Sequence, residues 1–408
     1  MPVIDCVVVG AGQAGLATSH HLTRLGVEHI VLDRGRVGET WRTARWDSFH
    51  LNTPNWATQL PGLRPAYAEP DAFAPLAEVV ELLARYAEDI GAPVRRAEAT
   101  ALRATNRSFE LTLADDELET RSVVVATGAF QQPAAPTPGS DPAAGMLQMH
   151  TSAYRNHEQL PDGGVLVVGS GQSGCEIGQE LLELGRDVHL AVGRCGWAPR
   201  RYRGREFVRW MVDVGLADET PDVLPNPRAR ISGNVAVSGT KGGRDCNPLV
   251  LERAGARLYG RFEGFESGRA LFAPDLDASI EFGSSFDRKF RARCDDFARA
   301  EALELPEHPP ALERPARDHD PTELDLEREG VRTVLWAGGF RPAFSWIDLP
   351  IFDELGFPRA TRGVTDVPGL VFVGLPWLSK RKSPLLLGVG DDAGHVASAI
   401  AAHLRVAP

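Results

Sequence analysis

The sequence predicts an α/β protein with two dinucleotide-binding, Rossmann-like domains, the second inserted into a discontinuous first domain. The segment Val7–Gly15, VVVGAGQAG, recurs as Leu166–Gly174, LVVGSGQSG. Each copy joins a short aliphatic run, of the kind found in buried parallel strands, to a glycine turn and a helical pattern. The second copy lies between two strand-like segments, 119–130 and 331–339, that both run into small-residue turns.

The order of elements is the same in both copies. The first predicts a helix over 13–25 and a strand over 28–32, and the second a helix over 172–184 and a strand over 187–192. Each helix is followed by a glycine, where a left-handed C-cap costs least. One GxGxxG pattern is weak evidence, but a strand, turn, helix and strand unit that occurs twice is strong evidence for nucleotide binding.

The glycines of the repeated turn suit a pyrophosphate. The first makes the tight turn, the second lets the backbone approach the phosphates, and the third lets helix and strand pack closely. The helix N-terminus presents free N–H groups and the positive end of its dipole. The expected binding residues at these turns are Gly10, Gly12, Gln13, Ala14, Gly15, Gly169, Gly171, Gln172, Ser173 and Gly174.

The end of the second strand distinguishes the two sites. In the first unit this strand is followed by Asp33, whose carboxylate can accept hydrogen bonds from an adenosine ribose. The equivalent position in the second unit is Val192, with Arg194 close behind. A ribose 2′-phosphate prefers a guanidinium and no carboxylate, so we expect FAD at the first site and NADPH at the second, with Arg194 on the 2′-phosphate. Further arginines, expected either to assist Arg194 or to form a solvated face, are Arg200, Arg201, Arg203 and Arg205.

The position of the second unit predicts the domain limits. We expect an FAD-binding domain over 1–155 and 333–408, and an NADPH-binding domain over 156–332. Proline-rich segments at 133–138 and 306–315 suit the connections or surface loops that such an insertion needs. The remaining expected elements are a strand over 369–374, a glycine loop over 388–390 and a helix over 391–404.

With these motifs in place, the chain resembles the flavin-containing monooxygenase family, and within it the small bacterial flavoprotein monooxygenases often described as potassium-transport flavoproteins. The resemblance rests on the two glycine turns, on Gly38–Trp41 (GETW), on the turns Ala126–Gly128 and Ala337–Gly339, and on the glycine loop before the last helix. It covers nearly the whole chain and implies tightly bound FAD with NADPH in the cleft. Further cofactor contacts expected on this basis are Arg34, Trp41, Thr127, Gly128, Gly338, Gly388 and Asp391.

The resemblance also implies the reaction. NADPH reduces the flavin, O2 adds to the reduced flavin, and the C4a-hydroperoxide transfers one oxygen atom to a small nitrogen- or sulfur-containing substrate. The protein holds the nicotinamide against the flavin and excludes water. No metal is required, in keeping with the lack of an HExxH or clustered Cys/His pattern.

A branch-specific motif of this superfamily, FxGxxxHxxx(F/Y)(K/R), is partly present. His150, Tyr154 and Arg155 match it, whereas Ala144 replaces the leading aromatic residue and Gly145 comes one position early. The Tyr-Arg ending favours N- or S-oxygenation over Baeyer–Villiger oxygenation of a ketone, which stays an alternative. We expect His150 either to hold the two domains together or to take part in hinge motion.

The segment 38–62 is dense in aromatic, amide and proline residues and is expected to cover the flavin. Related enzymes use an asparagine near the flavin, and Asn52 and Asn55 are the candidates, although such amides are also common turn formers. The basic segment Ser379–Ser383 is either a solvated turn or an anchor for substrate, flavin or NADPH. We expect Asp391, at the start of the last helix, to act mainly as an N-cap.

Composition excludes several classes. The chain has 44 basic and 55 acidic side chains and a net charge of −11, which counts against nucleic-acid binding. Its five cysteines include no CxxC pair, which disfavours a disulfide framework, a zinc ribbon or a dithiol redox centre. Without a leader-like start or an apolar run of roughly 20 residues, a cytoplasmic protein without membrane contact is expected, and a homodimer is reasonable.

Two other classes stay open. One is a non-oxygenating NAD(P)H-flavin reductase, such as a disulfide or ferredoxin reductase, and the missing CxxC counts against its disulfide branch. The other is a regulatory protein that binds dinucleotides without turnover, which predicts bound nucleotide but no NADPH consumption.

Overall fold

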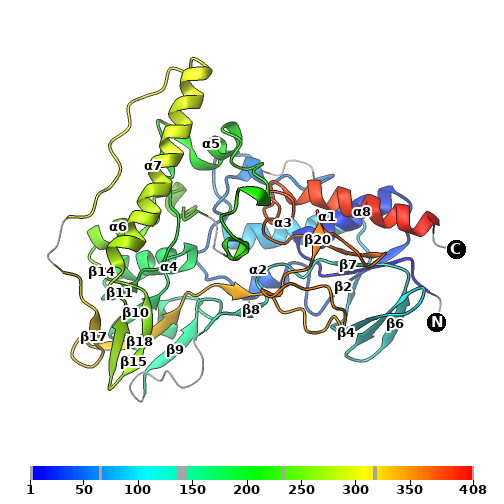
Figure 1. Cartoon of the computed structure of the whole chain (residues 1–408), viewed down its shortest axis with the longest axis horizontal. Coiled ribbons are helices and arrows are strands. Elements are labelled where there is room, and N and C mark those ends of the chain that lie inside the picture. The colour runs from blue at the N-terminus through cyan, green and yellow to red at the C-terminus, as the bar shows by residue number, and fades with distance from the viewer. Residues whose placement is uncertain (1–2, 64–66, 136–144, 232–234, 316–318, 407–408) are drawn as a thin grey trace.

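The computed structural model describes residues 3–63, 67–135, 145–231, 235–315 and 319–406. Its two largest sheets lie in separate lobes, with strand β8 (Gln132–Pro133) between them (Figure 1). The expected α/β fold with two dinucleotide-binding units is confirmed. Part of the first proline-rich segment, residues 136–138, and Ala144 lie outside the described residues.

The first unit is built on a seven-stranded sheet in the order β20-β21-β22-β7-β1-β2-β3. β1 is an inner strand between β7 and β2, and it is fully buried because all four of its side chains are apolar. It pairs in parallel with β2 and β7, as expected for a Rossmann-like sheet. The strands are β1 (Cys6–Val9), β2 (His29–Asp33), β3 (Val94–Arg96), β7 (Val123–Val125), β20 (Ala360–Thr361), β21 (Val364–Thr365) and β22 (Leu370–Phe372).

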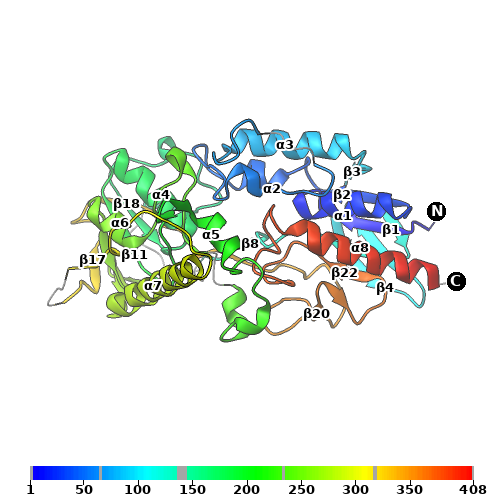
Figure 2. The same ribbon diagram turned by 90° about the horizontal axis from the view of Figure 1, so that it is seen from above.

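Helices α1 and α8, from opposite ends of the chain, pack against each other beside this sheet (Figure 2). Their buried faces carry small and branched apolar residues at helical spacing. The last helix begins at Val389, two residues before its predicted start, so Asp391 lies within its first turn and is not the expected N-cap. The helices of this unit are α1 (Gln13–Arg24), α2 (Glu39–Thr43), α3 (Leu76–Asp89) and α8 (Val389–Val406).

The second unit has a five-stranded parallel sheet in the order β14-β11-β10-β18-β9. Its strands are β9 (Leu147–His150), β10 (Gly164–Val168), β11 (Val188–Ala191), β14 (Arg257–Tyr259) and β18 (Val331–Trp336). Its helices are α4 (Gln172–Glu183), α5 (Phe207–Asp213), α6 (Pro248–Arg253) and the 25-residue α7 (Leu276–Ala300).

This sheet extends past the limits of 156 and 332 that the sequence predicts for the inserted unit. β9 pairs with β18, and β18 continues to Trp336. The predicted limits place β9 wholly, and β18 partly, in the first unit. Short aliphatic runs such as these do not show which sheet a strand joins.

Two connections run between the units and pair with each other. β8 lies antiparallel to β19 (Phe340–Arg341), which forms a short two-stranded ribbon. Smaller antiparallel sheets flank each lobe, β4 (Ala99–Ala104), β5 (Phe109–Leu113) and β6 (Glu117–Thr120) in the first, and β15 (Phe262–Glu266), β16 (Arg269–Phe272) and β17 (Glu323–Asp325) in the second. The two-stranded pair β12 (Arg201–Tyr202) and β13 (Arg205–Glu206) precedes α5.

Candidate nucleotide-binding and active site

The first glycine turn has a geometry that only glycine allows. Gly10 lies at φ +114°, and a Cβ at Gly15 would overlap the carbonyl oxygen of Gly10. By contrast, nothing lies within 4 Å of a Cβ at Gly12, and no side chain caps the N-terminus of α1. The free N–H groups and open backbone at this helix end fit a pyrophosphate.

The second turn repeats this geometry. Gly169 lies at φ +115°, and a Cβ at Gly174 would overlap the carbonyl oxygen of Gly169. Gly171 is open in the same way as Gly12, and α4 has no side-chain cap. Both units therefore have equivalent glycine turns whose open backbone at the start of a helix would fit a phosphate.

Asp33 lies where a ribose-binding carboxylate is expected. Its Oδ2 accepts a 2.8 Å hydrogen bond from the N–H of Ala11, and its Oδ1 accepts a 2.9 Å bond from the N–H of Gly35. The carboxylate is therefore held beside the glycine turn at the end of β2.

In the second unit Val192 is buried, and Arg194 is exposed just beyond β11. The intervening Gly193 is fixed by hydrogen bonds of 3.1 Å with the hydroxyl of Ser170. Among the described residues Arg194 has no ion-pair or hydrogen-bond partner, so its guanidinium is available to an anion.

The glutamine after each turn bridges to another segment. Gln13 accepts a 3.0 Å hydrogen bond from Trp41 and donates one of 3.3 Å to the carbonyl of Pro384. Gln172 accepts from the N–H of Val237 at 3.2 Å and donates to the carbonyl of the same residue. Each turn is thus held against the loops that face it.

Several other expected cofactor residues lie around the first turn. Thr127 and Gly128 follow β7 beside Gly10, and the Thr127 hydroxyl accepts a 2.7 Å bond from Gln131. Gly388 packs against Lys382, whereas Gly338 lies against Ala134 in the connection between the units. Of the other expected cofactor residues, Ala14 is buried in α1 and Arg34 is exposed after β2. Ser173 belongs to the second unit, where it is half-buried in α4.

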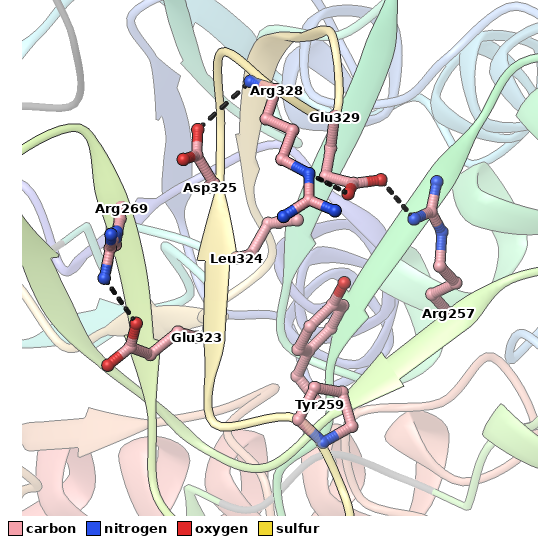
Figure 3. Close-up of a pocket in the computed structure, with 9 residues that line it drawn as sticks. Arg257, Tyr259, Arg269, Glu323, Leu324, Asp325, Arg328 and Glu329 are labelled. Carbon is pink, nitrogen blue, oxygen red and sulfur yellow. Dashed lines mark hydrogen bonds and ion pairs between the residues drawn. The ribbon is translucent and has the colours of Figure 1, made fainter.

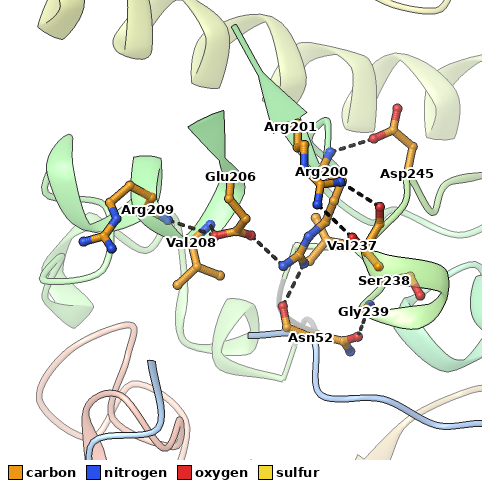
Figure 4. Close-up of polar contacts among 12 residues, drawn as sticks. Asn52, Arg200, Arg201, Glu206, Val208, Arg209, Val237, Ser238, Gly239 and Asp245 are labelled. Carbon is orange, nitrogen blue, oxygen red and sulfur yellow. Dashed lines mark hydrogen bonds and ion pairs between the residues drawn. The ribbon is translucent and has the colours of Figure 1, made fainter. Parts of the chain in front are cut away.

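The structure assigns Arg200 to the interior (Figure 4). It is 1% exposed, forms a 2.6 Å ion pair with Glu206, and donates a 2.8 Å hydrogen bond to the backbone carbonyl of Asn52. Burial lowers the pKa of Arg200 to about 10 and raises that of Glu206. A buried, paired guanidinium of this kind holds the fold together, so Arg200 is not part of the solvated face that was one of its two expected roles.

The three neighbouring arginines also have protein partners. Arg201 donates to the carbonyls of Gly242 and Gly243, Arg203 pairs with Asp295 at 3.0 Å, and Arg205 pairs with Asp213. The strongest arginine candidate for an anionic ligand in this region is therefore Arg194.

The two candidate asparagines differ in their surroundings. The Oδ1 of Asn52 accepts a 3.1 Å bond from the N–H of Gly239, which links segment 38–62 to the second unit. Asn55 is buried and donates a 3.0 Å bond to the carbonyl of Glu69, while its Oδ1 has no partner. Both amides connect loops.

His150 lies at the junction of the two units. Its Nε2 is 3.0 Å from the carbonyl oxygen of Gly339, its Nδ1 is 2.9 Å from the hydroxyl of Ser152, and its ring packs edge-on against Phe340. Burial lowers the pKa of this imidazole. The ring joins β9 to the connecting ribbon, which is the position of a linker or hinge residue.

The basic segment before α8 is paired with acids of the second unit. Lys380 and Lys382 contact Asp218 at 2.7 and 3.2 Å, and Arg381 contacts Glu219 at 2.8 Å. The Lys380 ammonium lowers the pKa of Asp218, with Lys382 adding to this effect. Asp391, beside these lysines, is exposed.

A polar cavity of about 460 Å³ lies elsewhere, between β14, β16 and β17 (Figure 3). Its arginines already have carboxylate partners: Arg257 pairs with Glu329, and Arg269 pairs with Glu323 at 2.9 Å. None of the expected site residues lines it, so we do not assign it to the reaction.

Within the described residues no cluster of His, Cys, Asp or Glu suits a metal ion, and no helix is long and apolar enough to cross a membrane. All five cysteines are free thiols, and four of them are buried.

Two charged residues near the turns, Arg45 and Glu176, are not among the residues that the sequence predicts for the site. Arg45 follows α2 and lies over aromatic rings, and Glu176 is buried in α4 with 3% exposure. The sequence does contain one signal for Glu176, which is the presence of a carboxylate among the small and apolar residues directly after the second glycine turn.

The family model of the pyridine nucleotide-disulphide oxidoreductases matches residues 7–212, which span the first unit's turn and the second unit's turn. The chain belongs to this oxidoreductase family. An uncharacterized CzcO-like oxidoreductase of Geobacillus kaustophilus is 30% identical over 98% of this chain and 99% of its own length. The expected oxidoreductase class, dependent on flavin and pyridine nucleotide, is therefore confirmed.

Within the family the chain is similar to flavin monooxygenases. Indole-3-pyruvate monooxygenase YUCCA1 of Oryza sativa is 36% identical over 47% of this chain and 48% of its own length. The structure of a flavin-containing monooxygenase from Stenotrophomonas maltophilia has the same fold, with a TM-score of 0.62, 20% identity, and coverage of 98% of this chain and 99% of that one. These similarities bear out the expected resemblance to flavin-containing monooxygenases.

Proposed function

We propose that the protein is an FAD- and NADPH-dependent monooxygenase that transfers one oxygen atom of O2 to a small nitrogen- or sulfur-containing substrate. One observation carries the cofactor assignment: two equivalent glycine turns differ at the end of the second strand. Asp33 is held there in the first unit, whereas in the second unit Val192 is followed by Arg194, which has no ionic or hydrogen-bond partner in the part of the chain that the structure describes. A carboxylate favours a free ribose, and an unpaired guanidinium favours a 2′-phosphate.

The residues around the turns would hold both groups. The open backbone at Gly12 and the start of α1 fit the FAD pyrophosphate, and Gly171 with the start of α4 fits that of NADPH. When bound, NADPH supplies a hydride and FAD accepts it and activates O2. Asn52 and Asn55, together with Trp41, are the side chains of segment 38–62 that we propose face the bound flavin.

Two features favour oxygenation over disulfide reduction. The cysteines include no CxxC pair, and Cys6, Cys175, Cys246 and Cys294 are buried. Burial raises the pKa of the thiol of Cys195 to about 12, which opposes the thiolate that disulfide exchange requires. The similarity to YUCCA1 also supports oxygenation over disulfide reduction.

The test combines absorbance and gas exchange. The purified protein is expected to carry FAD, to be reduced anaerobically by NADPH more efficiently than by NADH, and to consume O2 with oxidation of a test amine or thioether. Flavin reduction without any oxygenated product would indicate a reductase, and nucleotide binding without NADPH consumption would indicate a regulatory protein. Oxygenation confined to ketones would support the Baeyer–Villiger alternative.

A further inference from the structure

Glu176 is a buried carboxyl directly after the second glycine turn. It lies in the second turn of α4 and is 3% exposed, and its Oε2 has no hydrogen-bond partner among the described residues. Its Oε1 accepts a hydrogen bond from Gln172, the residue that also holds Val237. Burying a carboxylate with one free oxygen is costly unless it is neutral or paired with a positive charge.

Arg45, in the first unit, is the nearby positive charge from that unit, and it opposes the upward shift in the pKa of Glu176. The Arg45 guanidinium carbon lies 5.2 Å from the centre of the Trp41 ring, 5.5 Å from that of Phe49 and 4.8 Å from that of Phe130. Its Nη1 donates a 2.8 Å hydrogen bond to the carbonyl of Ala44. Among the described residues no carboxylate lies within ion-pair distance of Arg45, so the aromatic faces stabilise its charge.

The other charged groups around Glu176 are already engaged. Arg244 pairs with Glu183, and Arg200 pairs with Glu206 at 2.6 Å. The thiol of Cys246, which also lies near Glu176, is buried. Burial raises the pKa of Glu176 to about 8, although Gln172, Ser238, Arg244 and Arg45 oppose the shift. Glu176 therefore keeps its proton at neutral pH, and Arg45 is its available ionic partner.

We propose that Glu176 is a proton-controlled positioning residue that couples the two nucleotide units. In the arrangement described here it holds a proton, and Arg45 stays on its aromatic rings. When the proton passes to solvent, the carboxylate draws Arg45 off these rings into an ion pair between the units, which fixes the second turn against the first. The proposal rests on the proposed function only for the assignment of nucleotides to these turns, because the proton exchange itself needs no turnover.

Infrared titration of the purified holoprotein measures this proton directly. From about pH 6 to about pH 10, wild-type protein is expected to lose a buried, protonated carboxyl C=O signal with a midpoint near pH 8. Glu176→Gln is expected to remove that signal. The matched control is Glu180→Gln, one turn along α4, where the carboxylate accepts a 2.7 Å bond from Tyr154, and it is expected to retain the signal. A signal that persists in Glu176→Gln, or is absent from wild type, overturns the proposal.

Arg45→Met tests the ionic partner. Loss of this nearby positive charge is expected to move the Glu176 midpoint to higher pH, because the charge favours the carboxylate. Arg42→Met, three residues earlier, removes a side chain that donates to the carbonyl of Val37 and is expected to leave the midpoint in place. An unchanged midpoint in Arg45→Met contradicts the pairing.

Binding of NADP⁺ by calorimetry tests the coupling. Wild-type affinity is expected to rise several-fold across the same midpoint, with proton release that depends on buffer, whereas Glu176→Gln shows neither effect. Normal Glu176 titration without any pH-dependent change in affinity would refute the coupling and leave the proposed monooxygenase function intact. An absence of FAD and of NADP⁺ binding would refute the proposed function, and the infrared titration would still decide whether Glu176 holds the proton.

Discussion

The buried guanidinium of Arg200 donates a 2.8 Å hydrogen bond to the backbone carbonyl of Asn52, which joins the inserted unit to the segment expected to cover the flavin. Phe73 adds a ring face 4.2 Å from the guanidinium carbon, and Glu206 neutralises the charge. Arg200 is therefore part of the contact between the two units.

Removing Glu206 is expected to destabilise this contact strongly. Glu206→Leu leaves Arg200 buried without its carboxylate, and we expect a loss of about 3–5 kcal/mol in the free energy of unfolding, measured by urea denaturation. The exposed pair Arg299 and Asp296 supplies the control, since Asp296→Asn should change the free energy by less than about 0.5 kcal/mol. Equal effects of the two substitutions would contradict a structural role for Arg200.

The open glycines allow each nucleotide site to be blocked separately. Gly12→Ala and Gly171→Ala meet no neighbouring atom within 4 Å and require no unusual backbone angle, so both variants should fold. The added methyl group at Gly12 should impair FAD retention, and that at Gly171 should weaken NADPH binding with FAD still bound. Flavin absorbance and NADPH titration distinguish the two. Loss of FAD from Gly171→Ala alone would reverse the assignment of the sites.

Arg194→Ala should reduce affinity for NADPH about 10- to 100-fold, since charge-assisted hydrogen bonds contribute about 1.5–3 kcal/mol. Affinity for NADH, which lacks the 2′-phosphate, should change little. Arg253→Ala, at another exposed arginine of the second unit, is the control and should alter neither affinity. Equal weakening of both nucleotides by Arg194→Ala would exclude the 2′-phosphate contact.

His189 predicts a pH dependence of stability. Burial lowers the pKa of this imidazole from 6.5 to about 4. Between pH 6.5 and about pH 4, the imidazole is therefore protonated in the unfolded chain and neutral in the folded chain. The free energy of unfolding should therefore fall as pH is lowered from 6.5 toward 4, by up to about 1.4 kcal/mol per pH unit from this group. Denaturation of wild type and His189→Gln across this range should show a smaller slope in the variant. His157 is exposed, and His157→Gln should retain the wild-type dependence of the free energy of unfolding on pH. If His189→Gln also retained that dependence, His189 would not be its source.

The sequence was sufficient to predict those elements whose structure is determined by neighbouring residues. The helices after both turns begin at Gln13 and Gln172, as predicted, because the glycine geometry and the apolar periodicity are encoded locally. The sequence was insufficient to predict pairings and burial that depend on residues far away in the chain. The sheet joined by β9, the burial of Arg200 and the pairing of Lys380 with Asp218 each depend on residues far away in the chain. Glu176 was overlooked for the same reason, since nothing in its local sequence shows that Arg45 lies near it.

Oxygen-isotope transfer tests the central proposal most directly. FAD-loaded protein is supplied with NADPH, oxygen-18-labelled O2 and a panel of small amines and thioethers, and the products are examined by mass spectrometry. The monooxygenase assignment predicts one labelled oxygen atom in each oxidised product, with NADPH consumed in proportion. Recovery of all the label in hydrogen peroxide and water, with no labelled amine or thioether product, would contradict it.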